Sequence, residues 1–194
     1  MFARQKGRAQ GGAVAVEFSL VLMLFLVVAV GVIELARAMY LYNTLEMVTQ
    51  RAASLAANAD FRDAAAMNAV RQKAIFRTSA GTLMLGAPVT DAHVRIDYLA
   101  LTYAGAPALT EIPAAALPAC TVNNRTTCMK DPYDASCIRF VRARICDPAV
   151  TDTCNHVQYQ TLLSLVSLPL SLPNATAIAN AETLGATLGA APCP

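Results

Sequence analysis

The sequence predicts an α+β fold, with one long N-terminal helix followed by a second helix packed on a small antiparallel sheet with disulfide-tethered loops. Residues 13–57 contain no proline and a single glycine, so nothing interrupts a helix there. Residues 94–99 and 138–145 alternate apolar with charged side chains, which is typical of half-buried strands. All six cysteines follow residue 119, where they can join loops covalently.

Length and composition limit the possible functions. A chain of 194 residues holds one domain of about 100 to 150 residues with extensions. Only one window is long and apolar enough to cross a membrane, so we expect a single span in contact with membrane lipid. A net charge of +2 without a basic run argues against nucleic acid as a partner.

The distribution of charge around the apolar window predicts its orientation. Residues 1–12 carry Arg4, Lys6 and Arg8 with no acidic residue, so they should form a cytoplasmic leader. The transmembrane part then covers about residues 13–33, and the chain from about residue 35 onward lies outside the cytoplasm. All the cysteines would then be on the side where thiols are oxidised.

The helix should change character along its length of about 68 Å. Its first half is apolar on every side, whereas its second half has apolar residues at spacings of three and four, as a helix packed on a domain does. The residues of this apolar face are Leu35, Ala38, Tyr42, Leu45, Val48, Ala52 and Leu55.

Residues 58–194 should form the outer α+β domain. A second helix is expected at residues 61–79, with inward positions among Phe61, Ala65, Val70, Ala74 and Ile75. The strand at 94–99 should be followed by a long proline-containing loop and by a polar loop at 120–137. A second strand at 138–145 would point its three arginines outward, a further one should lie within 157–166, and residues 173–187 would form an edge strand.

The cysteines are even in number, which favours disulfides over other uses. They are Cys120, Cys128, Cys137, Cys146, Cys154 and Cys193, all but the last within a cysteine-rich segment at 120–154. Six cysteines allow 15 pairings, and the sequence does not choose among them. A zinc site is the alternative, but the spacings lack a C-x2-C pair. Free or intermolecular thiols are a third possibility.

The sequence contains none of the common enzyme signatures. It has no glycine-rich phosphate loop, no H-E-x-x-H and no G-x-S-x-G motif. Its two histidines, His93 and His156, stand in no spacing that favours a nucleophile pair, so we expect them to serve packing or to lie at the surface. We therefore predict a protein that is not an enzyme and has no cofactor or metal site.

Glu17 is the residue that points to function. A carboxylate one turn into a membrane helix costs a few kcal/mol unless it reaches water or a positive partner. It can snorkel to the cytoplasmic interface. Alternatively, a cut between Gly12 and Ala13 would create an α-amine four residues before Glu17, on the same helical face and available to a parallel neighbour.

The segment around this acid resembles a known family. Gly12, Ala13, Glu17 and the aromatic Phe18, followed by an apolar helix, resemble the prepilin peptidase signature of type IV pilins and pseudopilins. Residues 33–37, 40–42 and 51–57 resemble the TadE-like family, which comprises minor pseudopilins of the tight adherence (Tad, type IVc) pilus. The close resemblance covers roughly residues 8 to 57.

The resemblance implies a pilin-like fold and a role in the assembly, the priming or the tip of a Tad pilus that supports adhesion and biofilm formation. It implies a bacterial inner-membrane protein with its C-terminal domain in the periplasm, or outside the cell after assembly. Cleavage of the leader would occur at Gly12 and Ala13, with Glu17 as the assembly carboxylate. The implied partners are a prepilin peptidase, other pilin and pseudopilin subunits, and the Tad inner-membrane platform.

A different class of protein remains open. Ala36-Arg37-Ala38 follows the apolar run as an A-x-A signal-peptide cut site would, and cleavage before Met39 would release a secreted, disulfide-bonded periplasmic binding domain. An uncleaved, single-pass anchored version of that domain is equally compatible with the composition. Neither version explains Gly12 and Glu17.

Overall fold

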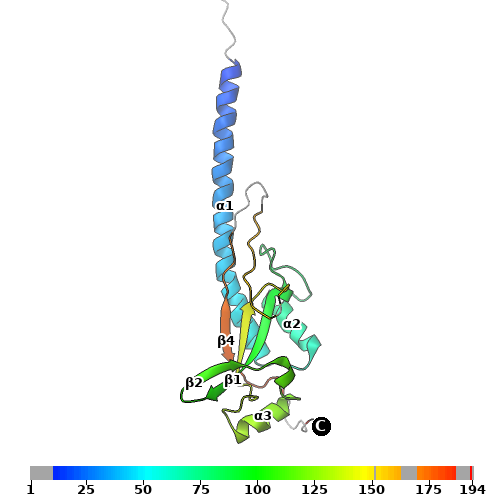
Figure 1. Ribbon diagram of the computed structural model, residues 1–194. Coiled ribbons are helices and arrows are strands. Elements are labelled where there is room, and N and C mark those ends of the chain that lie inside the picture. Colours follow the sequence, from blue (N-terminus) through cyan, green and yellow to red (C-terminus); the bar gives the residue numbers. More distant parts are fainter. Residues whose placement is uncertain (1–10, 151, 163–169, 187–192, 194) are drawn as a thin grey trace, which may run out of the picture. The chain divides into compact units, whose positions relative to one another are not determined.

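The computed structural model describes residues 11–150, 152–162, 170–186 and 193, and it divides into two compact units, residues 1–39 and 40–194. Most of the expected leader, and residues 163–166 of the strand expected within 157–166, lie outside the described residues. The α+β class is confirmed, since long and short helices accompany a four-stranded antiparallel sheet (Figure 1).

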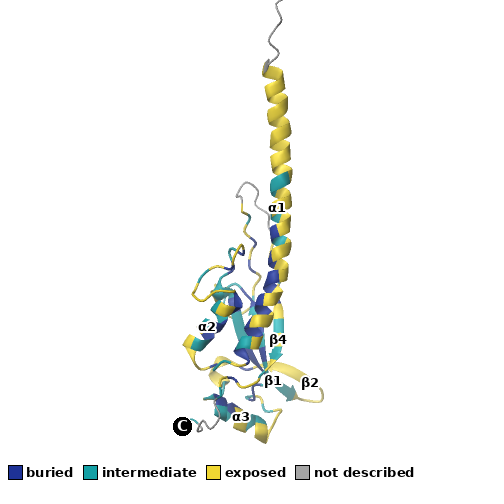
Figure 2. Cartoon of the chain, turned by 180° about the vertical axis from the view of Figure 1, so that it is seen from behind, coloured by how far each residue is buried: buried dark blue, intermediate teal, exposed yellow. Residues whose placement is uncertain are grey.

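Helix α1 (Gly11–Ala56) agrees with the predicted helix to within two residues. It forms because residues 13–56 lack proline and contain Gly31 as their single glycine. From residue 12 to 28 its side chains are exposed on every side, whereas from Leu41 onward one face is buried (Figure 2). The change from an all-round apolar surface to a one-sided one thus occurs as predicted.

The buried face of α1 differs in detail from the predicted one. From residue 41 to 56 its buried side chains are those of Leu41, Thr44, Leu45, Val48, Thr49, Ala52, Ala53 and Ala56. Leu45, Val48 and Ala52 were expected there, but Leu35 and Tyr42 are exposed. The apolar pattern placed the buried face incorrectly because this face includes two polar residues, Thr44 and Thr49. The Thr49 hydroxyl donates to the Glu46 carbonyl at 2.9 Å.

Helix α2 (Ala64–Ala74) is shorter than the expected 61–79. It begins where Asp63 accepts hydrogen bonds from the N–H groups of Ala65 and Ala66 at 2.8 and 3.2 Å, a side-chain N-cap. It ends before Phe76, whose φ of 60° lies in the left-handed region. Val70 and Ala74 are buried as predicted; Ala65 is exposed, and Met67 takes the inward place.

The sheet has the order β2-β1-β3-β4, with every pair antiparallel. Its strands are β1 (Val94–Tyr103), β2 (Pro107–Glu111), β3 (Phe140–Ile145) and β4 (Thr176–Asn180). Strands β1 and β3 and the edge strand β4 confirm three predictions. In the described part of 157–166, the only sheet-like pairing is an isolated bridge between Gln158 and Ser171, so the strand expected there is not formed by those residues.

Strand β2 corrects the prediction of a long loop after β1. Its residues pair with 99–103 of β1, and Gly105, at a φ of +88°, sits in the connecting turn in a conformation that glycine adopts without strain. Pro107, which suggested a loop, begins an edge strand, where proline is tolerated. Pro107 therefore begins the second strand of a β-hairpin and does not indicate a loop.

The core lies on one face of the sheet. Tyr98 and Ala100 of β1 join Val141 of β3 and side chains of α1 and α2 in one buried cluster, and Val94, at the start of β1, is also buried. Phe61, which precedes α2, packs its ring against Tyr98 at a centroid distance of 5.5 Å. The opposite face carries Arg142 and Arg144 of β3, so the outward orientation predicted for three arginines is confirmed for these two, while Arg139 lies just before the strand.

Residues 120–137 are not the loop that we expected. They contain helix α3 (Thr121–Lys130), and the short 3-10 turns Asp91–His93 and Ala114–Ala116 complete the described helices. Asn124 of α3 is buried, and its amide oxygen accepts the N–H of Ile138 at 2.8 Å, just before β3. The helix is therefore attached to the sheet by a polar side chain, which hydrophobic periodicity does not detect.

Candidate functional site

The predicted cleavage site lies in the first turn of α1. Gly12 and Ala13 follow the helix start at Gly11, where backbone N–H groups have no partner one turn earlier. Such a turn frays more easily than the helix interior. A Cβ added at Gly12 would meet no atom within 4 Å, so the fold of the described chain does not itself require glycine at this position.

Glu17 lies one helical turn after Ala13, and its side chain is exposed. Within the described residues it has no hydrogen-bond or ion-pair partner. Ser19 is the only other polar side chain between residues 13 and 33, and its hydroxyl donates to the Val16 carbonyl at 2.8 Å. Glu17 is therefore the one side chain in this described segment whose polar atoms must be satisfied from outside it.

The surface around Glu17 is continuously apolar. Fifteen large apolar side chains between residues 14 and 35 are exposed: Val14, Val16, Phe18, Leu20, Val21, Leu22, Met23, Leu24, Phe25, Leu26, Val27, Val28, Val32, Ile33 and Leu35. A water-soluble monomer does not carry an exposed apolar surface of this extent. By length and composition the helix from Gly12 to Ala56 can cross a membrane, and it is the one such helix among the described residues.

Charged and aromatic side chains follow the apolar run. Arg37 pairs with Glu34 at 3.8 Å between Nη1 and Oε2, the i, i+3 pair that the spacing suggests. Tyr40 and Tyr42 come next, and their hydroxyls donate to the carbonyls of Met84 and Ser171, each at 3.4 Å. These two tyrosines therefore tie α1 to loops of the outer domain.

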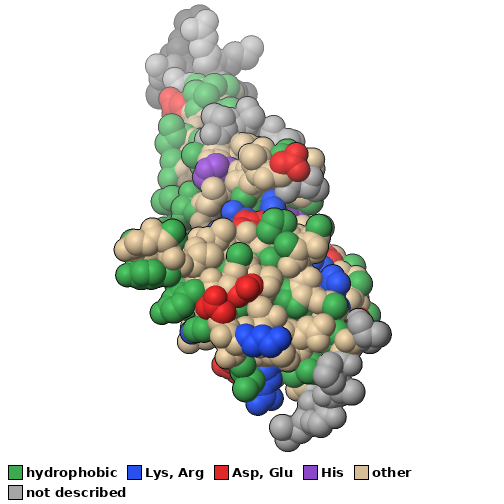
Figure 3. Space-filling model, turned by 60° about the horizontal axis from the view of Figure 1, so that its bottom comes forward, with side chains coloured by type: hydrophobic (Ala, Val, Ile, Leu, Met, Phe, Trp, Pro, Cys, Tyr) green, Lys and Arg blue, Asp and Glu red, His purple; other side chains and the backbone are tan. Residues whose placement is uncertain are grey.

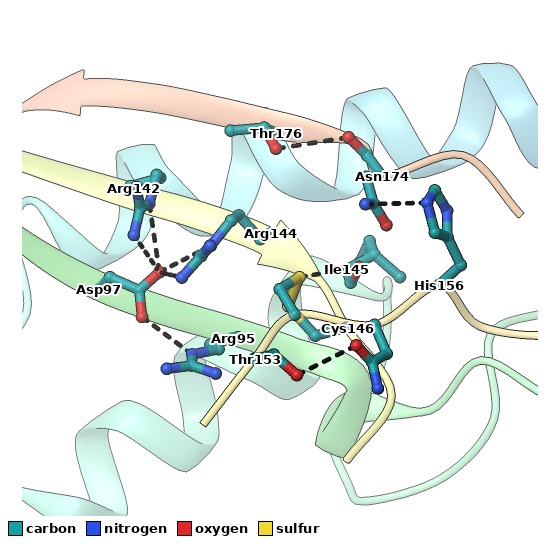
Figure 4. The surroundings of a disulfide bond; sticks show 12 residues. Arg95, Asp97, Arg142, Arg144, Ile145, Cys146, Thr153, His156, Asn174 and Thr176 are labelled. Atoms are coloured by element: carbon teal, nitrogen blue, oxygen red, sulfur yellow. Dashed lines mark hydrogen bonds and ion pairs between the residues drawn. A yellow bond between two sulfur atoms is a disulfide. The ribbon is translucent and has the colours of Figure 1, made fainter. Parts of the chain in front are cut away.

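A compact charge cluster occupies the sheet face away from the core (Figure 4). The side chain of Asp97 on β1 is only 5% exposed and forms ion pairs with three arginines. Its Oδ1 lies 3.1 Å from Nε of Arg95 and its Oδ2 lies 3.2 Å from Nη2 of Arg142, and Arg144 also contacts Oδ2. Glu111 of β2 pairs with the same arginines. Two carboxylates thus hold three guanidinium groups together across three strands, which is a structural arrangement without a nucleophile or an acid–base pair.

Both histidines contact the backbone. His93 Nδ1 lies 3.0 Å from the N–H of Thr90, and burial lowers the pKa of His93 below its ordinary value. His156 Nδ1 lies 3.1 Å from the Leu172 carbonyl, and its Nε2 lies 3.3 Å from Asn174. Each ring is used in packing a turn, in agreement with the role expected from sequence.

The six cysteines form three disulfides, so the favoured prediction of disulfides is confirmed. The pairs are Cys120–Cys193, Cys128–Cys137 and Cys146–Cys154. Two of them join neighbours along the chain, and the third spans 73 residues. No cluster of histidine, cysteine and acidic residues in the described ranges is arranged to hold a metal ion.

The surface of the outer domain shows no concentration of one charge on the face seen in Figure 3. Acidic and basic side chains lie there among apolar and neutral ones. A nucleic-acid interface needs basic side chains gathered over the path of a phosphate backbone. This face does not offer such a path.

Comparison with known proteins identifies the N-terminal segment. Residues 12–54 match the family model of TadE-like protein. No curated protein and no solved structure matches the chain. The matched residues include Gly12, Ala13 and Glu17 and end inside α1, before the outer domain has contributed any other element. Helix α1 thus carries a TadE-like segment, as the sequence resemblance predicted.

Proposed function

We propose that this chain is a minor pseudopilin of a tight adherence pilus, made as a precursor and cut between Gly12 and Ala13. The observation that carries the proposal is the first part of α1. A carboxylate that has no partner among the described residues stands one turn after a small-residue junction, in a helix that is TadE-like in sequence and whose surface around this carboxylate is apolar. In this proposal a prepilin peptidase of the inner membrane removes the leader.

Removal of the leader would supply the partner that Glu17 lacks. The new α-amine of Ala13 is a cation at the same depth as the carboxylate, because residues 13 and 17 are one turn apart. In parallel, staggered helices the amine of one subunit can reach the carboxylate of the next. The pairing would offset a burial cost of a few kcal/mol and favour docking between pilin subunits over free diffusion in the membrane.

The proposal places the N-terminus in the cytoplasm and the disulfide-bonded domain in the periplasm. Arg4, Lys6 and Arg8 before the apolar run support this orientation. The three disulfides support it independently, because such bonds persist in oxidising compartments. From the periplasmic side the subunit would serve priming or the pilus tip, in contact with the Tad platform during assembly and with a role in adhesion.

N-terminal sequencing of the mature protein tests this proposal. We expect a start at Ala13, and we expect Gly12→Asp to leave a full-length membrane form, because a charged side chain at the junction would block the peptidase. A Gly12→Ala control should mature at least in part, since a Cβ at this position meets nothing in the described chain. Normal processing of Gly12→Asp would contradict the cut site.

A second candidate is a secreted or simply anchored binding domain. Cleavage at Ala36-Arg37-Ala38 is favoured by one observation, that the second compact unit starts at Tyr40, next to the chain end that such a cut would create. The continuous helix through these residues disfavours it. A mature start at Met39 would establish the secreted alternative, and an intact Met1 would indicate a plain anchored protein.

A further inference from the structure

Strand β2 forms a free edge of the sheet. It pairs with β1 on one side, and every one of its five residues is exposed (Figure 1). Along its other side, the described residues contribute no hydrogen bond to the backbone of Leu109 or Glu111. An uncovered row of strand N–H and C=O groups is a template for another strand.

The register shows which groups point outward. The Ile112 N–H donates to the Tyr98 carbonyl at 2.9 Å, and these two residues are opposite each other in the continued β1–β2 register. In an antiparallel pair, residues that face the partner strand alternate with those that face away. Ala108 and Thr110 therefore bond to β1, whereas the backbone groups of Leu109 and Glu111 face outward together with the carbonyl of Pro107.

Of the usual devices that prevent edge pairing, this strand has a short length and a proline at its first residue. It has no lysine or arginine and no bulge, and its acid, Glu111, stands at one end with its carboxylate held by Arg142 and Arg144. Leu109, at its centre, is 47% exposed. At the other edge of the sheet, Thr176 of β4 lines a groove together with Tyr42 and Glu46 of α1, so that end of the strand lies beside the helix.

We propose that β2 binds the β2 of a second copy of this chain, antiparallel and about a twofold axis at Leu109. In that register Leu109 faces Leu109 of the second copy, and Pro107 faces Glu111. The two leucine N–H groups donate to the opposite leucine carbonyls, and each Glu111 N–H donates to a Pro107 carbonyl. Every outward N–H is then satisfied, since proline has none to place, and the Glu111 carbonyl opposite each proline is left to water.

Side chains favour the same register. Directly opposite residues share a face of the sheet, so the two Leu109 side chains would contact each other as an apolar cross-strand pair. Glu111 of each copy lies at opposite ends of the contact, so the two carboxylates stay apart. The result would be a continuous eight-stranded sheet built from two four-stranded ones. This contact does not depend on the cut at Gly12 or on Glu17.

Cysteine cross-linking of the full chain in membranes tests the register. In a hydrogen-bonded antiparallel pair the two Cα atoms lie about 5.5 Å apart, within disulfide range, so Leu109→Cys should form dimers under copper-phenanthroline oxidation. In the same register two Thr110→Cys sites lie diagonally, about 7 to 8 Å apart, near the limit for a disulfide. We expect roughly tenfold more dimer from Leu109→Cys than from Thr110→Cys or from an Ile178→Cys control on β4.

Proline substitution provides a second measurement. Leu109→Pro removes only an outward N–H, so β1 pairing survives while the dimer fraction of the full chain in detergent should fall severalfold. Ile178→Pro is the matched control, since its N–H also faces away from the neighbouring strand, and it should leave the dimer intact. Equal cross-linking at all three cysteine sites, no cross-link at Leu109→Cys, adducts with another protein in place of self-dimers, or an unchanged Leu109→Pro dimer would each overturn the proposal.

Discussion

Glu17 illustrates how one side chain can indicate function when the rest of its segment is uniform. Ser19, two residues later, satisfies its hydroxyl within its own helix, but a glutamate carboxylate cannot do so without a donor. In the described part of the chain no donor approaches Glu17. Its partner is then interfacial water or a cation beyond the described residues, such as an α-amine created at Ala13, and these two possibilities have different consequences for assembly.

Substitution of Glu17 distinguishes interfacial water from a cation as the partner of its carboxylate. Glu17→Ala should leave processing and membrane insertion largely intact and should strongly reduce incorporation into pili, because the carboxylate would pair only in the assembled state. Sheared pili probed with an antibody against the outer domain provide the measurement. Ser19→Ala is the matched control and should incorporate normally. Wild-type incorporation of Glu17→Ala would show that the acid merely reaches interfacial water.

The lowered pKa of His93 predicts that the stability of the outer domain depends on pH. Burial is the main cause of its lowered pKa, and the carboxylates of Asp147 and Asp91 raise the pKa only in part. The unfolded chain therefore binds a proton more readily than the folded one, so stability from this residue is present above the ordinary pKa of about 6.5 and is lost as the pH falls below it. Protonation would also remove the acceptor that Nδ1 offers to Thr90.

Proteolysis of the membrane-anchored protein at pH 7 and pH 5 measures this effect. We expect the outer domain to be cleaved faster at pH 5, and His93→Gln to show a smaller difference between the two values. His156→Gln should keep the wild-type difference. An undiminished pH effect in His93→Gln would assign the loss of stability to other groups.

At the scale of single elements, the sheet depends on charges as well as on its core. Asp97 connects arginines on β1 and β3 and is nearly inaccessible to water. Asp97→Ala would leave three guanidinium groups close together with Glu111 as their remaining carboxylate. Because those arginines are 20–27% exposed, we expect a loss of about 2 to 3 kcal/mol rather than the full cost for a buried pair.

Urea unfolding followed by circular dichroism in detergent tests the role of Asp97. Glu111→Ala removes the more exposed carboxylate, 41% accessible, and should cost at most about 1 kcal/mol. A similar shift of the urea midpoint for both variants would mean that Asp97 is no more important than a surface partner.

The elements differ in how well the sequence predicts them, and the reasons are physical. The long α1 contains no proline and a single glycine between residues 13 and 56, and β1 and β3 alternate apolar with charged residues, so the sequence predicts these three elements well. β2 and α3 lack such patterns: β2 is exposed on all five residues, and α3 depends on Asn124 and on the disulfide between Cys128 and Cys137. Contacts made by polar side chains and cysteines join distant segments, and no local pattern records them.

At the scale of the whole chain, the sequence predicts the segment around Glu17 better than it predicts the contacts within the outer domain. Gly12, Ala13 and Glu17 are close in sequence, so one short pattern of residues is enough to suggest a site. The pairing of six cysteines and the charge cluster around Asp97 depend on which strands become neighbours. Only the folded domain shows them, and the TadE-like match likewise ends at residue 54.

The disulfide between Cys120 and Cys193 affects how this molecule would carry a mechanical load. If the chain is pulled between its N-terminal helix and its C-terminal end, tension crosses from residue 120 to residue 193 through the sulfur atoms. The sequence between them, a separation of 73 positions that includes β3 and β4, lies outside the load path. Reducing all three disulfides would add roughly 250 Å of extensible chain to the load path, so oxidation keeps that length of chain from being pulled out.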